Sequence, residues 1–293
     1  MRKRLVAVDV DGTLLNTEFE DVLRDREIRA LDAVRDAGHV VALCTGRNMR
    51  SLRSLLANSS WEPPELPLVL LNGALVWGGE PWRRLACNVL DRQQIHALVK
   101  LFRGRDTVPL VYGSDDDGGH LYHEARPVND ILARYLALRR QTVGAIAEVA
   151  DLLDLDLPRA LEVGTIDERD RIFALSEDIA RELDGRVRTI NTRSLLGDGA
   201  YYWAEAYRTG SDKGTGLRTL AAASGFATED IVAIGDNYND LDMFAAAGVA
   251  VAMGNSPDEV LHEADLVTGS VDDSGAAEIL ERIAAGDFPG PAS

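Results

Sequence analysis

Two aspartates stand at the end of the first apolar run of the sequence, in the stretch VAVDVDGTLLN at residues 6–16. One valine separates Asp9 from Asp11, and Gly12 and Thr13 follow at once. Like charges at this spacing repel each other, and each carboxylate loses hydration where a buried strand ends. A bound cation is the simplest compensation. The stretch therefore predicts a cation site in which carboxylates can do chemistry.

Three further apolar segments end in polar residues. Thr45 follows the second segment, Asn72 follows the third, and Asp236 and Asp240 follow the segment IVAIG at 231–235. In an open parallel sheet the active site lies at the carboxyl ends of the strands, so these side chains converge if their strands are neighbours. A cluster of oxygen ligands suits a hard cation that keeps some water, which favours Mg²⁺ over Zn²⁺.

Each motif also has a structural explanation when it stands alone. D-x-D-G begins like a calcium-binding loop, but that loop needs glycine at its sixth position, and Gly12 is in the fourth. An Asx-turn accounts for the aspartates, a helix cap for Thr45, and a solvated surface charge for Lys213. Only the combination, in this order and at strand ends, points to catalysis.

The motifs lie in two regions, one near each end of the chain, where the sequence predicts alternating strands and helices. Near the amino end the apolar pattern predicts strands at 5–10 and 39–44 and helices at 25–38, capped by Asp25, and through Leu52–Leu56. Near the carboxyl end it predicts strands at 231–235 and 249–253 and helices at 213–223, 240–247 and 275–285. Such repeats with short connections indicate an α/β fold with a parallel sheet and right-handed crossovers.

The middle of the chain has a different pattern. It predicts helices at 91–102, 129–138 and 169–183 and strands at 108–112, 160–165 and 187–190, none followed by a run such as VDVDGT or IGDNYND. We therefore expect a catalytic core made of residues 1–83 and 203–293, with an α+β domain inserted at 84–202. The acidic stretch GSDDDGGHLYH at 113–123 is expected to be a solvated loop of this insertion rather than a second metal site.

Composition narrows the classes of partner. The 293 residues carry a net charge of −17, from 48 acidic and 31 basic side chains. This balance disfavours nucleic acid and anionic membranes, which bind to basic surfaces. The two cysteines, Cys44 and Cys87, are too few for a disulfide framework and are expected to be buried thiols. No apolar run is long enough for a signal sequence or a spanning helix, so we expect a cytoplasmic protein with no membrane partner.

Six stretches together carry a family resemblance. They are DVDGT (9–13), CTGR (44–47), LNGA (71–74), SDKG (211–214), GDNYND (235–240) and AGVAVAMGNS (247–256). As a set they resemble the haloacid dehalogenase superfamily of phosphotransferases, and most of all its Cof-type phosphatases with a C2 (type IIB) cap. The resemblance implies a Rossmann-like parallel-sheet core with an inserted α+β cap domain. It implies almost nothing about residues 84–200 beyond the position of the insertion.

The resemblance also implies roles for individual residues. Asp9 would be the nucleophile, and Asp11 the general acid and base. Mg²⁺ would be held by Asp9, by Asp11 through its main-chain carbonyl, and by Asp236, with Asn237 and Asp240 just outside these ligands. Substrate and phosphate contacts would come from Thr45, Gly46, Arg47, Asn72, Lys213 and Asn239. Two alternatives stay open for Arg47, which either holds the substrate or closes a salt bridge.

The activity that follows is a Mg²⁺-dependent phosphatase. It would hydrolyse small phosphorylated metabolites, such as sugar phosphates or phosphorylated cofactors, through an aspartyl-phosphate, as a monomer or a small homo-oligomer. One alternative is a phosphomutase or another phosphotransferase on the same site. A second is a non-catalytic phosphometabolite-binding protein, and a third is a phosphoacceptor receiver domain, which is a much smaller fold.

Overall fold

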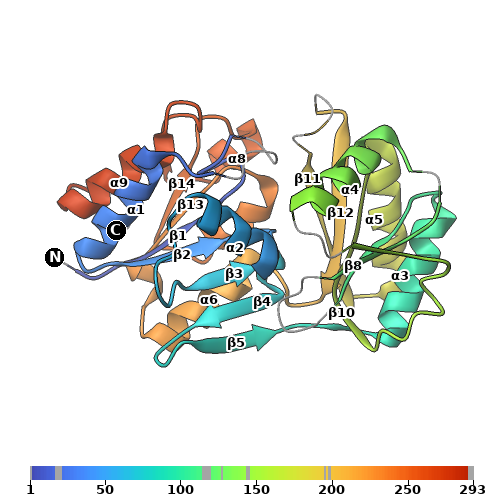
Figure 1. Ribbon diagram of the computed structural model, residues 1–293. Coiled ribbons are helices and arrows are strands. Elements are labelled where there is room, and N and C mark those ends of the chain that lie inside the picture. The colour runs from blue at the N-terminus through green and yellow to red at the C-terminus, as the bar shows by residue number, and fades with distance from the viewer. Residues whose placement is uncertain are drawn as a thin grey trace. The chain divides into compact units, whose positions relative to one another are not determined.

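The computed structural model describes residues 2–16, 22–113, 120–126, 128–142, 146–194, 196 and 199–289. The chain forms two compact units (Figure 1). The first comprises Met1–Arg47, Leu55–Ala86 and Asp212–Ser293, and the second comprises Asn48–Ser54 and Cys87–Ser211. The sequence predicts an insertion at 84–202, whereas the second unit runs from 87 to 211 and also takes in 48–54. Of the acidic stretch at 113–123, residues 114–119 lie outside the described part of the chain.

The first unit is built on an eight-stranded sheet with the spatial order β15-β14-β13-β1-β2-β3-β4-β5. Strands β15 to β3 along this order are parallel, and β4 is antiparallel to β3. The prediction of an α/β core with a parallel sheet is therefore confirmed. The strands are β1 (Leu5–Val8), β2 (Val40–Cys44), β3 (Leu68–Leu70), β4 (Leu75–Gly78), β5 (Arg83–Cys87), β13 (Ile231–Gly235), β14 (Val249–Ala252) and β15 (Leu266–Val267).

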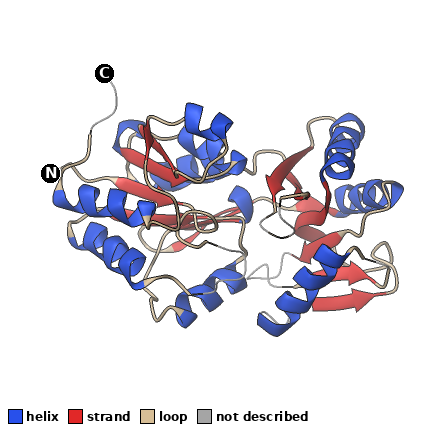
Figure 2. Ribbon diagram, turned by 90° about the horizontal axis from the view of Figure 1, so that it is seen from above, coloured by secondary structure: helices blue, strands red, loops and turns tan. Residues whose placement is uncertain are grey.

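Helices cover both faces of this sheet (Figure 2). Helices α1 and α9 pack against each other, while α6 packs on β3, β4 and α7. The covered strands are apolar on both faces, as parallel strands between helices must be. The helices of this unit are α1 (Asp25–Asp36), α6 (Lys213–Ser224), α7 (Leu241–Phe244), α8 (Asp258–His262) and α9 (Gly275–Ala285), with 3-10 turns η1 (Leu71–Gly73), η2 (Thr228–Asp230) and η3 (Tyr238–Asp240). Helix α2 (Met49–Asn58) is divided between the two units.

Strand β1 ends earlier than its apolar run. The run extends to Val10, but the last backbone bond to the next strand is made by the Asp9 amide, which donates to the carbonyl of Ile234 at 2.9 Å. Beyond it, the carbonyl of Val10 accepts from the amides of Leu14 and Leu15, so the chain turns instead of extending. This turn places Asp9 and Asp11 just beyond the carboxyl end of β1.

Two local predictions about helices are wrong. Asp25 does not cap α1. Arg24 occupies the cap position and makes no capping bond with its side chain, while Asp25 lies in the first turn, where its negative charge interacts favourably with the helix dipole. The helix expected at 240–247 is only Leu241–Phe244. Asn237 caps the preceding 3-10 turn, and the amides of Ala246 and Ala247 bond to the carbonyls three residues earlier, as in a 3-10 helix.

The cysteines differ from each other. Cys44, at the end of β2, is fully buried, as expected, whereas Cys87, at the end of β5, is exposed. The prediction of a buried thiol is therefore wrong for Cys87, because β5 lies at the edge of the sheet.

The second unit contains a mostly antiparallel sheet with the order β11-β12-β10-β7-β8-β9, and β6 pairs with β10. Helices α3 and α5 pack on one face with residues such as Leu98 and Ile172, and α4 packs on the other with residues such as Leu132. The strands are β6 (Leu90–Asp91), β7 (Leu110–Gly113), β8 (Leu121–Glu124), β9 (Ile146–Val149), β10 (Arg159–Glu168), β11 (Val187–Arg193) and β12 (Tyr201–Arg208), and the helices are α3 (Arg92–Gly104), α4 (Asp130–Thr142) and α5 (Arg169–Leu183).

Among the described residues, no helix combines the length and the apolar character that crossing a bilayer requires.

A buried histidine joins the beginnings of β1 and β2. His39 is 6 % exposed, and its Nδ1 accepts a hydrogen bond from the amide of Arg4 at 3.0 Å. Burial lowers the pKa of His39, and the nearby guanidinium of Arg4 lowers it further. The imidazole of His39 therefore stays neutral in the folded protein at pH values at which the same imidazole in the unfolded chain is already protonated.

We predict that this histidine makes stability depend on pH. Since its pKa is lower in the folded state, its contribution is complete above about pH 6.5 and is lost as the pH falls below that value, at up to about 1.4 kcal/mol per pH unit. His39→Asn keeps an acceptor for the Arg4 amide but does not titrate. Urea unfolding of both proteins from about pH 5 to 7.5 measures the difference, and parallel pH profiles would contradict the prediction.

Candidate active site

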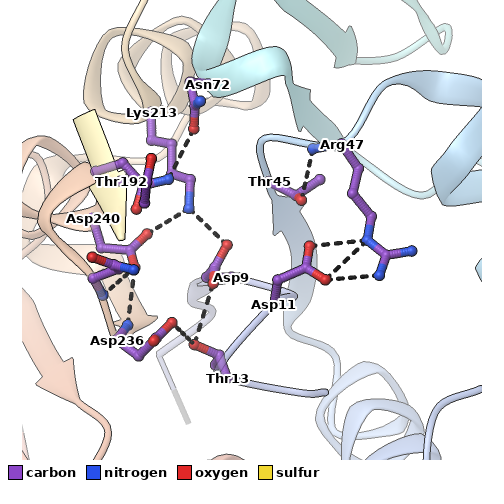
Figure 3. A network of polar contacts seen from close by, with 12 residues as sticks. Asp9, Asp11, Thr13, Thr45, Arg47, Asn72, Thr192, Lys213, Asp236 and Asp240 are labelled. Carbon is purple, nitrogen blue, oxygen red and sulfur yellow. Dashed lines mark hydrogen bonds and ion pairs between the residues drawn. The ribbon is translucent and has the colours of Figure 1, made fainter. Parts of the chain in front are cut away.

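The strand-end residues of the first unit meet at one edge of its sheet (Figure 3). Strand β1 lies between β2 and β13, with Leu5 in register with Val40 on one side and Ile231 on the other. Parallel neighbours in register end together, so the residues that follow them become neighbours as well. Asp9, Thr45 and Asp236 occupy these three ends, as the sequence pattern requires.

A buried lysine stands between two of the carboxylates. Nζ of Lys213 lies 2.6 Å from Oδ1 of Asp9 and 2.7 Å from Oδ1 of Asp240, and its side chain has no exposed surface. Burial alone lowers the pKa of a lysine, but the charges of Asp240 and Asp9 outweigh it and raise the pKa of Lys213. The lysine is therefore a permanent cation in this cluster.

The start of helix α6 fixes this lysine. Asp212 is the N-cap residue, and its Oδ1 accepts a hydrogen bond from the amide of Thr215 at 2.6 Å. Lys213 is thereby the first residue of the helix. A cation is unfavourable at the positive end of a helix, so its position depends on the carboxylates that surround it.

A threonine links Asp9 to a third carboxylate, that of Asp236. Oγ1 of Thr13 lies 3.2 Å from Oδ1 of Asp236 and 3.4 Å from Oδ2 of Asp9. The turn that delivers Thr13 passes through Gly12, whose φ is +90°, and a Cβ on this residue would overlap the Asp236 carboxylate. Only glycine satisfies both the backbone angle and the close approach.

Asp240 is engaged on both oxygens by protein groups. Its Oδ1 accepts from Lys213, and its Oδ2 accepts from the amides of Asp236 and Asn237 at 2.9 and 3.0 Å. The side chain thus orients the lysine and the loop that carries Asp236. Asn237 caps the same turn, since its Oδ1 accepts from the amide of Tyr238 at 2.8 Å.

The cluster carries more negative than positive charge. Each of Asp9, Asp236 and Asp240 offers an oxygen within 4.8 Å of the others, and all three are buried. Burial raises the pKa of Asp9 to about 7; Lys213 opposes this shift and Asp240 adds to it. Burial likewise raises the pKa of Asp236 well above its ordinary value. Three buried carboxylates beside one lysine fit a hard divalent cation, which would supply the missing positive charge.

The side chain of Asp11 turns away from this cluster toward Arg47 (Figure 3). Nε of Arg47 lies 2.9 Å from Oδ2 of Asp11, and Nη2 lies 2.7 Å from Oδ1, so the ion pair is bidentate. Arg47 is 6 % exposed. Of the two alternatives for this arginine, the described contacts are those of a salt bridge.

The remaining predicted residues contact one another near the ends of β2 and β3. Oγ1 of Thr45 accepts a hydrogen bond from the amide of Arg47 at 3.0 Å, with Gly46 between them. Asn239 donates from its side chain to Oδ1 of Asn72 at 3.0 Å, and Asn72 is completely buried. These two asparagines, predicted as separate substrate contacts, therefore contact each other.

Two residues that hold the site had no role in the sequence prediction. Asp212 positions the helix of Lys213, and the pattern D-x-x-T that creates its cap is visible in SDKGT. Asn255 donates to the carbonyl of Gly12 at 3.0 Å and accepts from the amide of Val271 at 2.8 Å. It ties the turn after β1 to a distant loop, which no local pattern reveals.

We predict that Asp240→Asn lowers the free energy of unfolding by about 3 kcal/mol or more. An amide has one acceptor oxygen, so its NH₂ group must face either Lys213 or the two backbone amides that Asp240 now satisfies. Urea denaturation measures the loss. The matched control is Asp258→Asn, an exposed aspartate for which we expect a change within about 0.5 kcal/mol. Equal stabilities of the two variants would contradict the prediction.

Comparisons with known proteins find similar phosphatases that match over nearly their whole length. Bacillus subtilis YwtE, named 5-amino-6-(5-phospho-D-ribitylamino)uracil phosphatase, is 27 % identical over 97 % of this chain and 99 % of its own length. Escherichia coli YbhA, named pyridoxal phosphate phosphatase, is 26 % identical over 92 % of this chain and 94 % of its own.

Solved structures and a family profile extend the similarity to the fold. The crystal structure of a haloacid dehalogenase-like hydrolase from Bacteroides thetaiotaomicron matches with a TM-score of 0.77 and 26 % identity, over 96 % of this chain and 100 % of the other. The HAD subclass IIB sugar phosphatase BT4131 shares the fold, with a TM-score of 0.74 and 18 % identity over 98 % and 100 %. The family profile matches residues 6–280. The resemblance seen in the sequence is confirmed, and the chain belongs to the haloacid dehalogenase-like hydrolases.

Proposed function

We propose that this protein is a Mg²⁺-dependent phosphatase that hydrolyses small phosphorylated metabolites through an aspartyl-phosphate. The observation that carries the proposal is the buried group of Asp9, Asp236 and Lys213 at the ends of neighbouring elements of the first unit. YwtE and YbhA, both matched over nearly their whole length, are named as phosphatases of small phosphorylated compounds.

The metal ligands in this proposal are Asp9, Asp236 and the main-chain carbonyl of Asp11. The charge of the carboxylate cluster fits such an ion, as does its all-oxygen chemistry. When bound there, Mg²⁺ would offset the negative charge of the phosphoryl group and of the carboxylates around it. Asp240 stays outside the ligand set because Lys213 and two backbone amides already engage its oxygens at 2.7 to 3.0 Å. Oδ2 of Asp9, by contrast, accepts a long bond from Thr13 at 3.4 Å.

In the first step the ionised carboxylate of Asp9 attacks phosphorus. A bond forms between a carboxylate oxygen and phosphorus, the bond from phosphorus to the ester oxygen breaks, and Asp11 gives a proton to the departing oxygen. Lys213 and Thr45 stabilise the phosphoryl oxygens as charge accumulates on them. Lys213 suits this task because its neighbours keep it protonated.

In the second step water hydrolyses the aspartyl-phosphate. Asp11 takes a proton from the water as its oxygen attacks phosphorus, and the bond between phosphorus and Asp9 breaks. Inorganic phosphate leaves, and both aspartates return to their starting states. We further propose that the second unit acts as a cap, which admits the substrate and then excludes bulk water from these steps.

We predict that Asp9→Asn lowers Mg²⁺-dependent release of phosphate from p-nitrophenyl phosphate by about 10³-fold or more, since the amide is a poor nucleophile. The change is nearly isosteric, so the fold should persist, and circular dichroism checks this. Asp258→Asn is the control of the same chemistry at an exposed position. Undiminished turnover by the Asp9 variant would refute the mechanism.

Isotopic water separates the alternatives. A phosphatase transfers one oxygen of H₂¹⁸O into the released phosphate, whereas a phosphomutase or another phosphotransferase leaves the phosphoryl group on an organic acceptor. A non-catalytic binding protein releases no phosphate from any member of a panel of phosphorylated metabolites. The panel also identifies the preferred substrate.

We predict that Mg²⁺ raises the unfolding temperature of the wild-type protein and that Asp236→Asn abolishes most of this shift. Binding of one ion at about 100 times its dissociation constant stabilises the folded state by about 2.7 kcal/mol. Differential scanning calorimetry with and without Mg²⁺ measures the effect, with NaCl at equal ionic strength as the control. A shift of equal size in the variant would place the ion elsewhere.

A further inference from the structure

We propose that Arg47 is a positioning residue that acts through Asp11, and not a ligand of the transferred phosphoryl group. The inference rests on the proposed function, because it concerns how the general acid and base is held. Three features of the first unit support it: the geometry of the ion pair, the position of Asp11 in a turn beyond the end of β1, and the backbone that carries the arginine.

The ion pair fixes the orientation of the carboxylate. Nε and Nη2 of Arg47 approach different oxygens of Asp11, at 2.9 and 2.7 Å. Two parallel bonds from a planar guanidinium set both the position and the plane of a carboxylate, which a single bond from an ammonium group does not. The arginine side chain is 5 % exposed and that of Asp11 27 %, so the more exposed partner is held by the more buried one.

Hydrogen bonds of the turn after β1 hold the backbone around Asp11, such as the bond from the Gly12 amide to the Leu15 carbonyl at 2.8 Å, but they do not set the direction of the Asp11 side chain. Strand β1 ends at Val8, and the last bond to β13 is made by the Asp9 amide. Asp11 lies beyond it in the turn, where it forms an isolated bridge with Leu15 next to Gly12. A proton-transferring group must stay within hydrogen-bond reach of the reacting oxygen. Its orientation therefore depends on side-chain contacts.

The loop that carries Arg47 is held by an unusual turn. Leu71 and Asn72 both have left-handed backbones, with φ of 48° and 47°. Their amides donate to the carbonyls of Arg47 and Thr45, each at 3.2 Å. Left-handed backbone is unfavourable for leucine, and such conformations persist where the surrounding structure imposes them, often at functional sites.

The two left-handed residues thus align one loop against another. The amide of Arg47 also donates to Oγ1 of Thr45, so the backbone of this loop is fixed at the carbonyls of Thr45 and Arg47 and at the amide of Arg47. A fixed backbone and a buried side chain give Arg47 one position, from which it aims at Asp11. This is the construction expected of a residue that orients another.

A double-mutant cycle tests the inference. The four proteins are the wild type, Arg47→Met, Asp11→Asn and the double variant, and the substrates are p-nitrophenyl phosphate and a primary alkyl phosphate. We expect Arg47→Met to lower kcat about 10- to 100-fold when Asp11 is present, because general acid–base help is worth about 10² to 10⁴. We expect it to change kcat less than about twofold when Asp11 is replaced by asparagine, since its effect requires the carboxylate.

Leaving-group dependence gives a readout that a purely structural role would not move. The alkyl oxygen needs a proton to depart, whereas p-nitrophenolate does not, so Arg47→Met should affect the alkyl phosphate more strongly. KM should change less than about threefold for both substrates. Equal losses in the wild-type and Asp11→Asn backgrounds, or a roughly tenfold rise in KM with unchanged kcat, would overturn the inference and make Arg47 a substrate ligand.

Two further variants keep the test decisive. Arg47→Lys retains the charge but not the two-bond geometry, so we expect an unchanged fold and a kcat between those of the wild type and Arg47→Met. This variant replaces Arg47→Met in the test if the methionine variant is unstable. Arg26→Met is the matched control, since Arg26 makes a bidentate pair with Glu281 at 2.9 and 3.0 Å on the surface. Equal activity of the wild type and Asp11→Asn would contradict the role of Asp11 in the proposed function. Additive effects in the cycle, with Asp11→Asn impaired, would instead contradict the role of Arg47.

Discussion

The site depends on one buried cation. The side chain of Lys213 has no exposed surface, and its ammonium group contacts both Asp9 and Asp240. Taking these charges out of water costs free energy, and the attraction between them offsets the cost only with good geometry. That geometry comes from three independent elements: the end of β1, the start of α6 and the turn after β13. Each is held by backbone bonds or caps, so the cluster is preorganised before any ligand arrives.

The backbone around the cluster is shaped by close approach. Gly12 passes so near the Asp236 carboxylate that a side chain would collide with it, and Gly214 lies against the carbonyl of Asp242 in the same way. After strand β3, Leu71 and Asn72 have left-handed backbone angles that most residues avoid. Unfavourable conformations of this kind survive where packing and hydrogen bonds determine them. Their concentration here gives the polar groups fixed directions, which a catalytic site requires.

The two units differ in the motifs that they carry. The core shows a contiguous parallel sheet whose strand ends carry the polar residues. The second unit has its own two apolar clusters, one under α3 and α5 and one under α4, so it is a compact body by itself. Its sequence has no motif that names a ligand, and relatives of similar length are named for chemically different phosphorylated compounds.

The sequence by itself determined the fold class, the six motifs and the identity of the carboxylates, because apolar runs that end in polar residues are local patterns. It also placed α5 and α9 at their observed bounds. Only the tertiary structure decided that Asp11 pairs with Arg47, that Asn72 contacts Asn239, and that Asn255 holds Gly12. These partners are 36, 167 and 243 residues apart in the chain. Contacts over such separations depend on strand order and on the path of each turn, and neither is written in any short stretch of sequence.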